Sequence, residues 1–263
     1  SDATDALERD GFDIRIGHQA DSIGNADLVV YSAAVPSSNE ELEAAERRGI
    51  DVVGRAELLG EIARTSFTIA IAGTHGKTTT SAMVASILDA AGLEPAVAIG
   101  GYVKGQVQGR WTDAGYFVVE ADEFDKSFLK IYPNAAVVTS IDAEHLDCYG
   151  DEAGVQAGFV DFLHRLPFYG QLVLAGESRG VRDVIPHLAC SYSTYGVETD
   201  NRFHSRNIRL REWGTDFELF DGDLPLGEVE LNVPGRHNLL NAIGAAAMVR
   251  LLGISIEHVG AGL

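Results

Sequence analysis

Residues 71–80, with the sequence IAGTHGKTTT, combine two glycines, a lysine and three threonines directly after an apolar segment. The segment before them, FTIAI, is typical of a short buried strand, and the residues after them carry apolar side chains at helical spacing as far as Gly92. The loop therefore joins a strand to a helix. The first N–H groups of a helix have no partners within the helix, and the helix dipole favours negative charge, so an anion fits at such a junction. The pattern predicts a phosphate-binding loop.

Two side chains of this loop are suited to a metal-bound phosphate. Lys77 supplies a positive charge, and Thr78 supplies a hydroxyl group for a magnesium ion. Only two residues separate Gly73 from Gly76, whereas the common phosphate-loop pattern has about four, so the loop is a shortened variant. An ordinary turn between a strand and a helix is the alternative. We expect Lys77 to be an exposed loop residue that contributes little to packing.

Carboxylates end a second apolar strand, in the run EADEFD at residues 120–125. Glu120 follows two valines directly, at the carboxyl end of the strand, where open α/β sheets place their ligand-binding crevices. Magnesium binds a few carboxylate or hydroxyl oxygens together with waters and nucleotide phosphates, so Thr78 and Glu120 are a suitable pair of protein ligands. Asp125 belongs to the same run, but a solvated acidic loop explains it equally well.

Two further motifs hold side chains that suit a nucleotide. In the run SIDAEHLD at residues 140–147, His145 follows another predicted strand and can ligate a metal through neutral imidazole, orient a phosphate, or be a structural histidine. In GRHNLLN at residues 235–241, Asn238 is either the N-cap of the last long helix or, with Asn241, one of two amides on the same helix face. Amide groups can hydrogen-bond the edge of an adenine ring.

Strands and helices alternate along the chain, which predicts an α/β fold with parallel sheets. Up to about residue 65 the pattern is that of a Rossmann-like domain that is truncated before its first strand. The predicted strands of this domain lie near residues 13–18, 26–35 and 50–53, and its helices near 39–49 and 55–64.

A second α/β unit is predicted from residue 66 onward. Its buried strands after the glycine loop lie near residues 116–123, 134–141 and 171–176. Between residues 203 and 233, alternating segments with an Asp-Gly turn predict a small antiparallel β ribbon. A helix is predicted from about residue 238 to residue 252.

The composition excludes several classes of protein. The chain of 263 residues has a formal net charge of −19, and such a surface repels a nucleic-acid backbone. Hydrophobic residues make up 46% of the sequence, which is enough for a folded core. No apolar run approaches the length of about 18 residues that a membrane-spanning helix needs, and no secretory signal is recognisable. The sequence therefore predicts a cytoplasmic protein without a membrane or nucleic-acid partner.

Four motifs in order, GTHGKTT, EADEFD, AEHLD and GRHNLLNA, resemble those of the Mur ligases of bacterial cell-wall synthesis. The similarity runs through nearly the whole chain, since ADLVVYSAAVP and GRAELLGEI resemble the family's first domain and FLHRLPFYG its central one. The family has three domains, which bind the UDP-sugar, ATP, and the incoming amino acid. The resemblance implies a truncated UDP-sugar-binding domain at residues 1–65 and a P-loop-type ATP-binding domain at residues 66–263. The C-terminal domain is expected to be absent, so we expect the fragment alone to be inactive.

The implied reaction is an ATP- and Mg²⁺-dependent ligation in peptidoglycan precursor synthesis. ATP phosphorylates the carboxylate of UDP-N-acetylmuramate, and the amine of L-alanine then attacks the acyl phosphate. By the same resemblance Lys77 contacts the β- and γ-phosphates, Thr78 and Glu120 bind the first magnesium ion, and His145 binds the second. Lys77, Glu120 and His145 are the implied catalytic residues, because phosphoryl transfer between anions needs its charge neutralised. The implied nucleotide-binding residues are Gly73, Thr74, His75, Gly76, Lys77, Thr78, Thr79, His237, Asn238 and Asn241, of which the two asparagines would hold the adenine.

The amine acceptor stays open at this point. A ligase that attaches a ready-made tripeptide to the same UDP-sugar during cell-wall recycling shares these motifs, and a nucleotide-binding module without turnover is a further alternative. The oligomeric state, a monomer or a homodimer, is open as well. Many relatives carry asparagine where this chain has Ser140, so no contact is predicted for that residue.

Overall fold

The computed structural model describes residues 2–101 and 109–263. The chain divides into two compact units, Ser1–Leu59 and Gly60–Leu263, which are described in turn. Within the described ranges, no helix is both long enough and apolar enough to cross a membrane.

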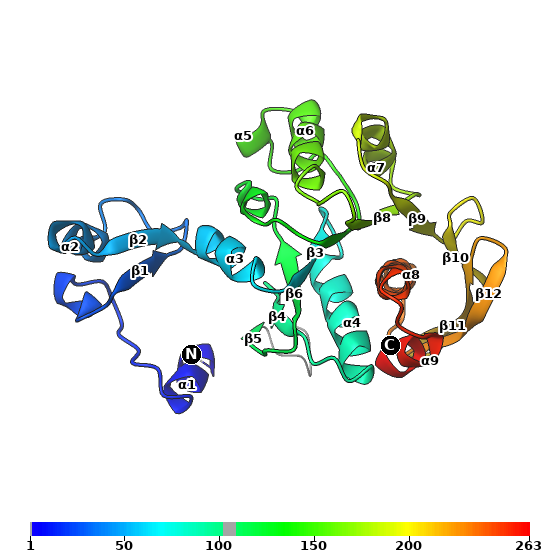
Figure 1. Cartoon of the computed structure of the whole chain (residues 1–263), viewed down its shortest axis with the longest axis horizontal. Helices are drawn as coiled ribbons and strands as arrows, with labels where there is room; N and C mark the ends of the chain where they lie inside the picture. Colours follow the sequence, from blue (N-terminus) through cyan, green and yellow to red (C-terminus); the bar gives the residue numbers. More distant parts are fainter. Residues whose placement is uncertain (1, 102–108) are drawn as a thin grey trace. The chain divides into compact units, whose positions relative to one another are not determined.

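The first unit contains a small parallel sheet. Strands β1 (Leu28–Tyr31) and β2 (Asp51–Gly54) pair in parallel, and helix α2 (Glu40–Arg48) connects them (Figure 1). Helix α2 begins where the side chain of Asn39 accepts a hydrogen bond from the N–H of Glu41, at 2.9 Å. Its first turn is acidic and its last turn basic, which suits the helix dipole. This β–α–β order follows the alternation that the sequence predicts.

One predicted strand of the first unit is wrong. Residues 13–18 form no strand, although their apolar and polar side chains alternate. Ile16 is 89% exposed, so the alternating pattern covers no apolar surface and gives strand pairing no packing energy. The Arg15 guanidinium instead donates hydrogen bonds to Asp13 Oδ2 at 2.8 Å and to the Ser22 carbonyl at 3.1 Å. Helix α1 (Asp2–Arg9), which the sequence did not predict, precedes this segment, and the 3-10 turn η1 (Ala20–Ile23) follows it.

The second unit is built on one mixed sheet, which has ten strands among the described residues in the order β12-β11-β10-β9-β8-β7-β3-β6-β4-β5. From β10 to β4 in that order each strand is parallel to its neighbour, whereas β11, β12 and β5 pair antiparallel. The sheet confirms the predicted α/β class. The strands are β3 (Phe67–Ala72), β4 (Ala96–Ala98), β5 (Gly109–Arg110), β6 (Tyr116–Ala121), β7 (Ala135–Val138), β8 (Gln171–Ala175), β9 (Ser193–Gly196), β10 (Phe203–Arg211), β11 (Gly214–Asp221) and β12 (Leu224–Leu231).

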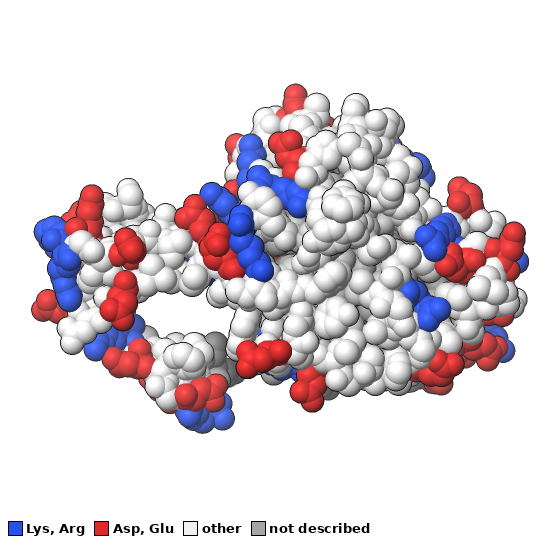
Figure 2. Space-filling model, viewed as in Figure 1, with Lys and Arg blue, Asp and Glu red and all other residues white. Residues whose placement is uncertain are grey.

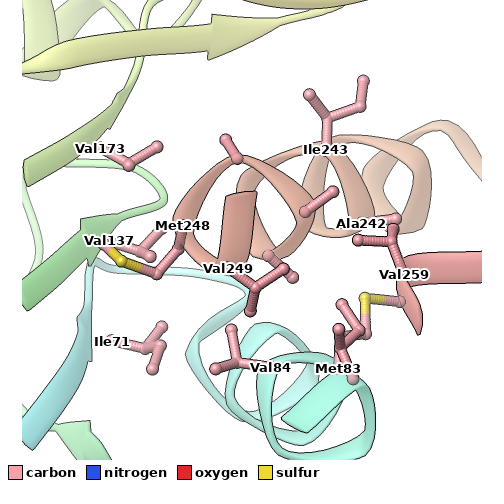
Figure 3. Packing of buried hydrophobic residues seen from close by; sticks show 14 of the residues in the cluster. Ile71, Met83, Val84, Val137, Val173, Ala242, Ile243, Met248, Val249 and Val259 are labelled. Carbon is pink, nitrogen blue, oxygen red and sulfur yellow. The ribbon is translucent and has the colours of Figure 1, made fainter. Parts of the chain in front are cut away.

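Helices cover both faces of this sheet (Figure 1). On one face lie α4 (Lys77–Ala90), α8 (Arg236–Leu251) and α9 (Ile256–Gly262). Figure 3 shows Val84 of α4 facing Val249 of α8, with apolar side chains of β3, β7 and β8 to their left. These side chains belong to one continuous buried cluster, so the two helices are fixed to the central strands by close packing.

Aromatic packing fixes the opposite face. There, α6 (Glu152–Leu163) presents Phe162, whose ring stacks on Phe128 with the centroids 4.9 Å apart. Phe128 belongs to the 3-10 turn η2 (Ser127–Lys130), which follows the acidic run after β6. The remaining elements near this face are the short helix α5 (Leu146–Tyr149), α7 (Arg179–Val184) and η3 (Ile185–His187), and helix α3 (Arg55–Ala63) crosses the boundary between the two units in sequence.

The predicted antiparallel ribbon is not separate from the main sheet. Strands β10, β11 and β12 pair antiparallel, but β10 also pairs in parallel with β9, so the ribbon continues the sheet at its edge. Ion pairs join its strands, among them Arg211 Nη1 to Glu230 Oε1 at 2.7 Å and Arg202 Nε to Asp221 Oδ1 at 2.7 Å. Figure 2 shows acidic and basic side chains intermingled over this part of the surface.

We expect Gly244→Ala in α8 to lower the free energy of unfolding by about 1–2 kcal/mol, because overpacking outweighs the gain in helix propensity. A Cβ atom at Gly244 would lie 2.7 Å from Cζ of the buried Tyr195. Gly260→Ala in α9 is the matched control, since a Cβ there meets nothing within 4 Å and should stabilise by up to about 1 kcal/mol. Urea unfolding of the two variants measures both effects. Equal stabilisation by the two substitutions would show that α8 is not tightly packed at Gly244.

Candidate functional site

The carboxyl ends of the parallel strands gather the predicted site residues at one edge of the sheet. Strand β3 leads into the glycine loop at residues 73–76, β6 into the acidic run, and β7 into the segment that ends at His145. Because β3 lies between β6 and β7 in the sheet, the glycine loop stands between two polar loops. Open α/β sheets bind their ligands at such an edge.

Both glycines of the loop are required by close contacts. Gly73 has a φ of 132°, and a Cβ atom there would lie 2.2 Å from Thr139 Oγ1. Gly76 has a φ of 83° and precedes the first residue of α4, and a Cβ atom there would lie 2.5 Å from Asn241 Oδ1. Side chains larger than hydrogen are therefore excluded at both positions, by space and by backbone conformation.

Thr139 and Ser140 at the end of β7 hold the loop in place. The Ser140 carbonyl accepts a hydrogen bond from the N–H of Thr74 at 3.0 Å, and Ser140 Oγ accepts one from the N–H of His75 at 3.0 Å. The Thr139 hydroxyl donates to the carbonyl groups of Ala72 and His75. Ser140 thus supports the loop that precedes α4, a role that the sequence did not predict.

Lys77 is not the exposed loop residue that the sequence suggested. Its side chain is only 12% exposed, and Nζ donates hydrogen bonds to the Gly73 carbonyl at 2.7 Å and to Glu123 Oε2 at 2.7 Å. The Glu123 side chain is 3% exposed, so the two residues form a buried ion pair. The Glu123 carboxylate holds the Lys77 ammonium group back toward the loop, because each charge is the buried partner of the other.

Thr78 and Glu120 lie together, as predicted for a pair of metal ligands. Thr78 Oγ1 donates to the Glu120 carboxylate, with distances of 3.0 and 3.1 Å to its two oxygens. The N–H of Gly100 also donates to Glu120 Oε2, at 2.8 Å, and so orients the carboxylate. A hydroxyl and a carboxylate beside the glycine loop form the hard oxygen donor set that Mg²⁺ prefers, so these residues fit a magnesium ion.

His145 lies beside Glu123. It adopts the left-handed conformation with a φ of 56°, and its Nε2 is 4.0 Å from Glu123 Oε1. Its ring meets the edge of Phe124 with the centroids 5.0 Å apart. Among the described residues, no group of three or more His, Cys, Asp and Glu side chains is arranged to hold a metal ion.

Tyr149 fixes the segment that carries His145. Its hydroxyl donates to the Glu123 carbonyl at 2.7 Å, which ties α5 to the acidic run. Burial raises the pKa of Tyr149, and the negative charge of Glu123 raises it further, so the hydroxyl keeps its proton. This hydrogen bond holds His145 and Glu123 on neighbouring backbone segments.

A cavity of about 650 Å³ adjoins the glycine loop. Its walls come from the loop, from the ends of β7 and β8, and from the start of α8. Six of the predicted nucleotide-binding residues line it together with the loop-supporting Thr139 and Ser140, namely His75, Gly76, Thr79, His237, Asn238 and Asn241. The structure therefore brings together the two motifs that the sequence assigned to the phosphates and to the adenine.

Asn238 is not the N-cap of α8, which corrects one of the two sequence interpretations. Helix α8 begins at Arg236 with Gly235 as its N-cap, and the Asn238 side chain donates to the Pro234 carbonyl at 2.7 Å. Asn241 lies one turn further along α8 and is largely buried against Gly76. Both amides reach the cavity wall, although Asn238 is partly committed to Pro234.

The sequence reasoning missed Glu123, Glu177 and Arg236. Glu177 lines the cavity, accepts a hydrogen bond from the N–H of Glu198 at 2.9 Å, and pairs with Arg236 Nη2 at 3.1 Å. Glu177 follows β8 by one glycine, so its position after a parallel strand was an available signal. Asp125, in contrast, accepts a hydrogen bond from the N–H of Ser127 at 2.9 Å and stays exposed, as a local turn residue does.

The fold and the site define an α/β protein whose glycine-rich loop, at the edge of a parallel sheet, is suited to binding phosphate. Comparison with known families extends this conclusion to the whole chain. The family described as "Mur ligase middle domain" matches residues 71–249, and "Mur ligase family, catalytic domain" matches residues 1–67. The chain belongs to the Mur ligase family.

Curated relatives match the chain from end to end. A UDP-N-acetylmuramate–L-alanine ligase of Geobacter sp. (strain M21) is 41% identical over 263 residues, which are 100% of this chain and 57% of the relative. The ligase of the same name from Salinibacter ruber is 41% identical over 265 residues, which cover 100% of this chain and 56% of the relative. The chain thus spans somewhat more than half the length of the curated relatives that it matches.

Two solved structures share the fold. UDP-N-acetylmuramate-alanine ligase MurC from Thermotoga maritima is 26% identical with a TM-score of 0.86, covering 100% of this chain and 60% of that chain. A UDP-N-acetylmuramate:L-alanyl-gamma-D-glutamyl-meso-diaminopimelate ligase from Neisseria meningitides is 25% identical with a TM-score of 0.86, covering 98% of this chain and 85% of that chain.

We expect Lys77→Met to lower the free energy of unfolding by about 3–5 kcal/mol, because it leaves the Glu123 carboxylate buried without a countercharge. Adding Glu123→Gln to the same chain should recover most of this loss. Lys126→Met is the control at an exposed lysine, and it should change stability by no more than about 1 kcal/mol, because the only contact it removes is that of Nζ with the Tyr149 ring at 4.9 Å among those that the structure describes. Chemical unfolding of the wild type, Lys77→Met, Glu123→Gln and the double variant forms a double-mutant cycle. A double variant no more stable than Lys77→Met would refute the buried pair.

Proposed function

We propose that the protein containing this chain is a cytoplasmic, ATP-dependent ligase that joins L-alanine to UDP-N-acetylmuramate in peptidoglycan precursor synthesis. The names of the relatives that match the chain at 41% identity support the reaction. The observation that carries the proposal is the arrangement at the sheet edge, where the glycine loop, the Thr78–Glu120 pair and the cavity beside Asn238 and Asn241 adjoin one another. This arrangement fits a nucleoside triphosphate with its base in the cavity and its phosphates at the loop.

Residues of the loop act on the phosphates in this proposal. The N–H groups at the start of α4 lie ahead of the first helical hydrogen bond, from the N–H of Thr80 to the Gly76 carbonyl, and are therefore available to phosphate oxygens. Lys77 stabilises the charge of the transferring phosphoryl group. Thr78 and Glu120 hold a magnesium ion, which neutralises charge on the phosphate oxygens when it is bound. His145 and Glu123 stand on the adjoining side of the loop, where the acceptor carboxylate and a second metal ion would lie.

The remaining assignments follow the family's domain order. Residues 1–65 belong to the UDP-sugar-binding part, and residues 66–263 form the ATP-binding part. The acyl phosphate forms on the carboxylate of UDP-N-acetylmuramate, and the amine of L-alanine displaces phosphate from it. Phosphoryl transfer of this kind depends more on position and charge neutralisation than on a protein nucleophile, which suits a site of lysine, hydroxyl and carboxylate groups.

A tripeptide ligase is the second candidate. The structure from Neisseria meningitides, whose name specifies a tripeptide, has the same TM-score of 0.86 as the L-alanine ligase from Thermotoga maritima. Fold similarity therefore does not discriminate between the two acceptors, and the sequence identity of 41% to L-alanine ligases favours the first.

The protein that contains this chain should form UDP-N-acetylmuramoyl-L-alanine when it is incubated with ATP, Mg²⁺, UDP-N-acetylmuramate and radiolabelled L-alanine. Parallel reactions with labelled tripeptide test the second candidate. Product from tripeptide but not from L-alanine would replace the proposed acceptor. Nucleotide binding without either product would identify a binding module instead.

Glu120→Gln should raise the Mg²⁺ concentration that half-saturates nucleotide binding by about tenfold, because it weakens one of two proposed protein ligands. Isothermal titration with ATP at increasing Mg²⁺ concentrations measures this change in the full chain. Asp125→Asn is the matched control, since it removes one charge from the same acidic run but keeps an acceptor for the N–H of Ser127. Identical Mg²⁺ titrations for Glu120→Gln and the control would place the metal elsewhere.

A further inference from the structure

Glu123 is a buried carboxylate that is not among the proposed ligands of the phosphates or of the metal ions. One of its oxygens, Oε2, accepts the hydrogen bond from Lys77 Nζ at 2.7 Å. The other, Oε1, is buried without a hydrogen-bond partner, and His145 Nε2 lies 4.0 Å from it. Buried carboxylate oxygens are normally hydrogen-bonded, because a lost partner costs the desolvation of the group. The free oxygen therefore points to a group that joins the site only with a ligand.

Two of the three N–H donors of Lys77 are held by short hydrogen bonds within the protein. An ammonium group has three N–H donors, and Nζ lies 2.7 Å from the Gly73 carbonyl, 2.7 Å from Glu123 and 3.5 Å from the Thr74 carbonyl. The third of these contacts is weak, so one donor can turn toward a phosphate without breaking the other two. Glu123 thus fixes where the lysine stands before any nucleotide arrives.

The same carboxylate reduces the attraction of the loop for a bare anion. The Lys77–Glu123 pair carries no net charge. A second carboxylate is also close, since Asp122 Oδ1 lies 3.8 Å from Lys77 Nζ. An incoming phosphate therefore meets a lysine whose charge is already balanced. Drawing the lysine fully onto the phosphate would leave Glu123 buried and unpaired, which is strongly unfavourable. A divalent cation bound to the phosphate supplies the positive charge that Lys77, paired with Glu123, does not.

We propose that Glu123 is a positioning residue that holds Lys77 in the loop and makes the site select a metal-bound polyphosphate over the metal-free one. The inference rests on the proposed nucleotide site. It assigns the dependence on a divalent cation partly to this carboxylate, in addition to the direct ligands Thr78 and Glu120. If the negative charge of Glu123 is removed, Lys77 attracts the phosphates whether or not a metal ion accompanies them.

Isothermal titration of the full chain with ATP, in buffer with excess Mg²⁺ and in buffer with EDTA, tests this inference. Glu123→Gln should bind ATP about tenfold more tightly than the wild-type chain in EDTA, because a like charge beside the phosphates is removed. In Mg²⁺ the same variant should differ from wild type by no more than about threefold, since the cation already compensates the carboxylate. Asp125→Asn is the control for a general change in charge and should match wild type in both buffers.

The outcomes separate this inference from the proposed function. If the wild-type chain binds Mg²⁺-ATP but Glu123→Gln gains no affinity in EDTA, the role of Glu123 is refuted and the nucleotide site stands. If the wild-type chain binds ATP in neither buffer, the nucleotide site and the role of Glu123 both fall. A purely structural role would weaken binding equally in the two buffers, which also refutes the inference. Thermal unfolding checks that Glu123→Gln is folded, and Glu123→Met removes the same charge if it is not.

Discussion

The contact between the glycine loop and the end of β7 determines the rest of the site. Thr139 and Ser140 bind the backbone of residues 72–75 through five hydrogen-bonding contacts of side chains and main chain. Only glycine fits at position 73, because the two backbones approach too closely for a Cβ atom. Since α4 starts directly after this loop, the contact fixes the position of the helix N-terminus, and with it the N–H groups, Lys77 and Thr78.

The few positive groups at the glycine loop lie within a chain that is strongly negative as a whole. The formal net charge is −19, yet the proposed ligand is a polyanion. At the loop, the N-terminus of α4 and Lys77 supply positive charge for this ligand, while Glu120 and Glu123 add negative charge close by. Such a site is suited to a ligand that brings its own cations. The two carboxylates favour a cation-bound ligand in different ways. Glu120 is hydrogen-bonded to the Thr78 hydroxyl, and Glu123 is paired with the Lys77 ammonium group.

The sequence predicted the parts of the fold whose signals are local. Buried strands, the strand–loop–helix junction at residues 71–80 and the pairing of Thr78 with Glu120 follow from apolar runs and from the common edge of parallel strands. The burial of Lys77 did not follow, because it depends on which residue of the run EADEFD turns inward. Which residue turns inward depends on contacts with residues distant in sequence, such as the hydrogen bond from the Tyr149 hydroxyl to the Glu123 carbonyl. The strand prediction for residues 13–18 was wrong for the same reason. An alternating sequence stabilises a strand only where its apolar side chains pack on another apolar surface, and Ile16 is exposed.

The close contact between Gly76 and Asn241 has a consequence for inhibitors. Both residues line the cavity of about 650 Å³, and the space for a Cβ atom at position 76 is already filled by the Asn241 side chain. A compound that rests on this pair would touch a backbone position where substitution is blocked by geometry as well as by φ. Resistance would then have to arise at other walls of the cavity, such as Glu177, where exchange of the side chain leaves the glycine loop intact.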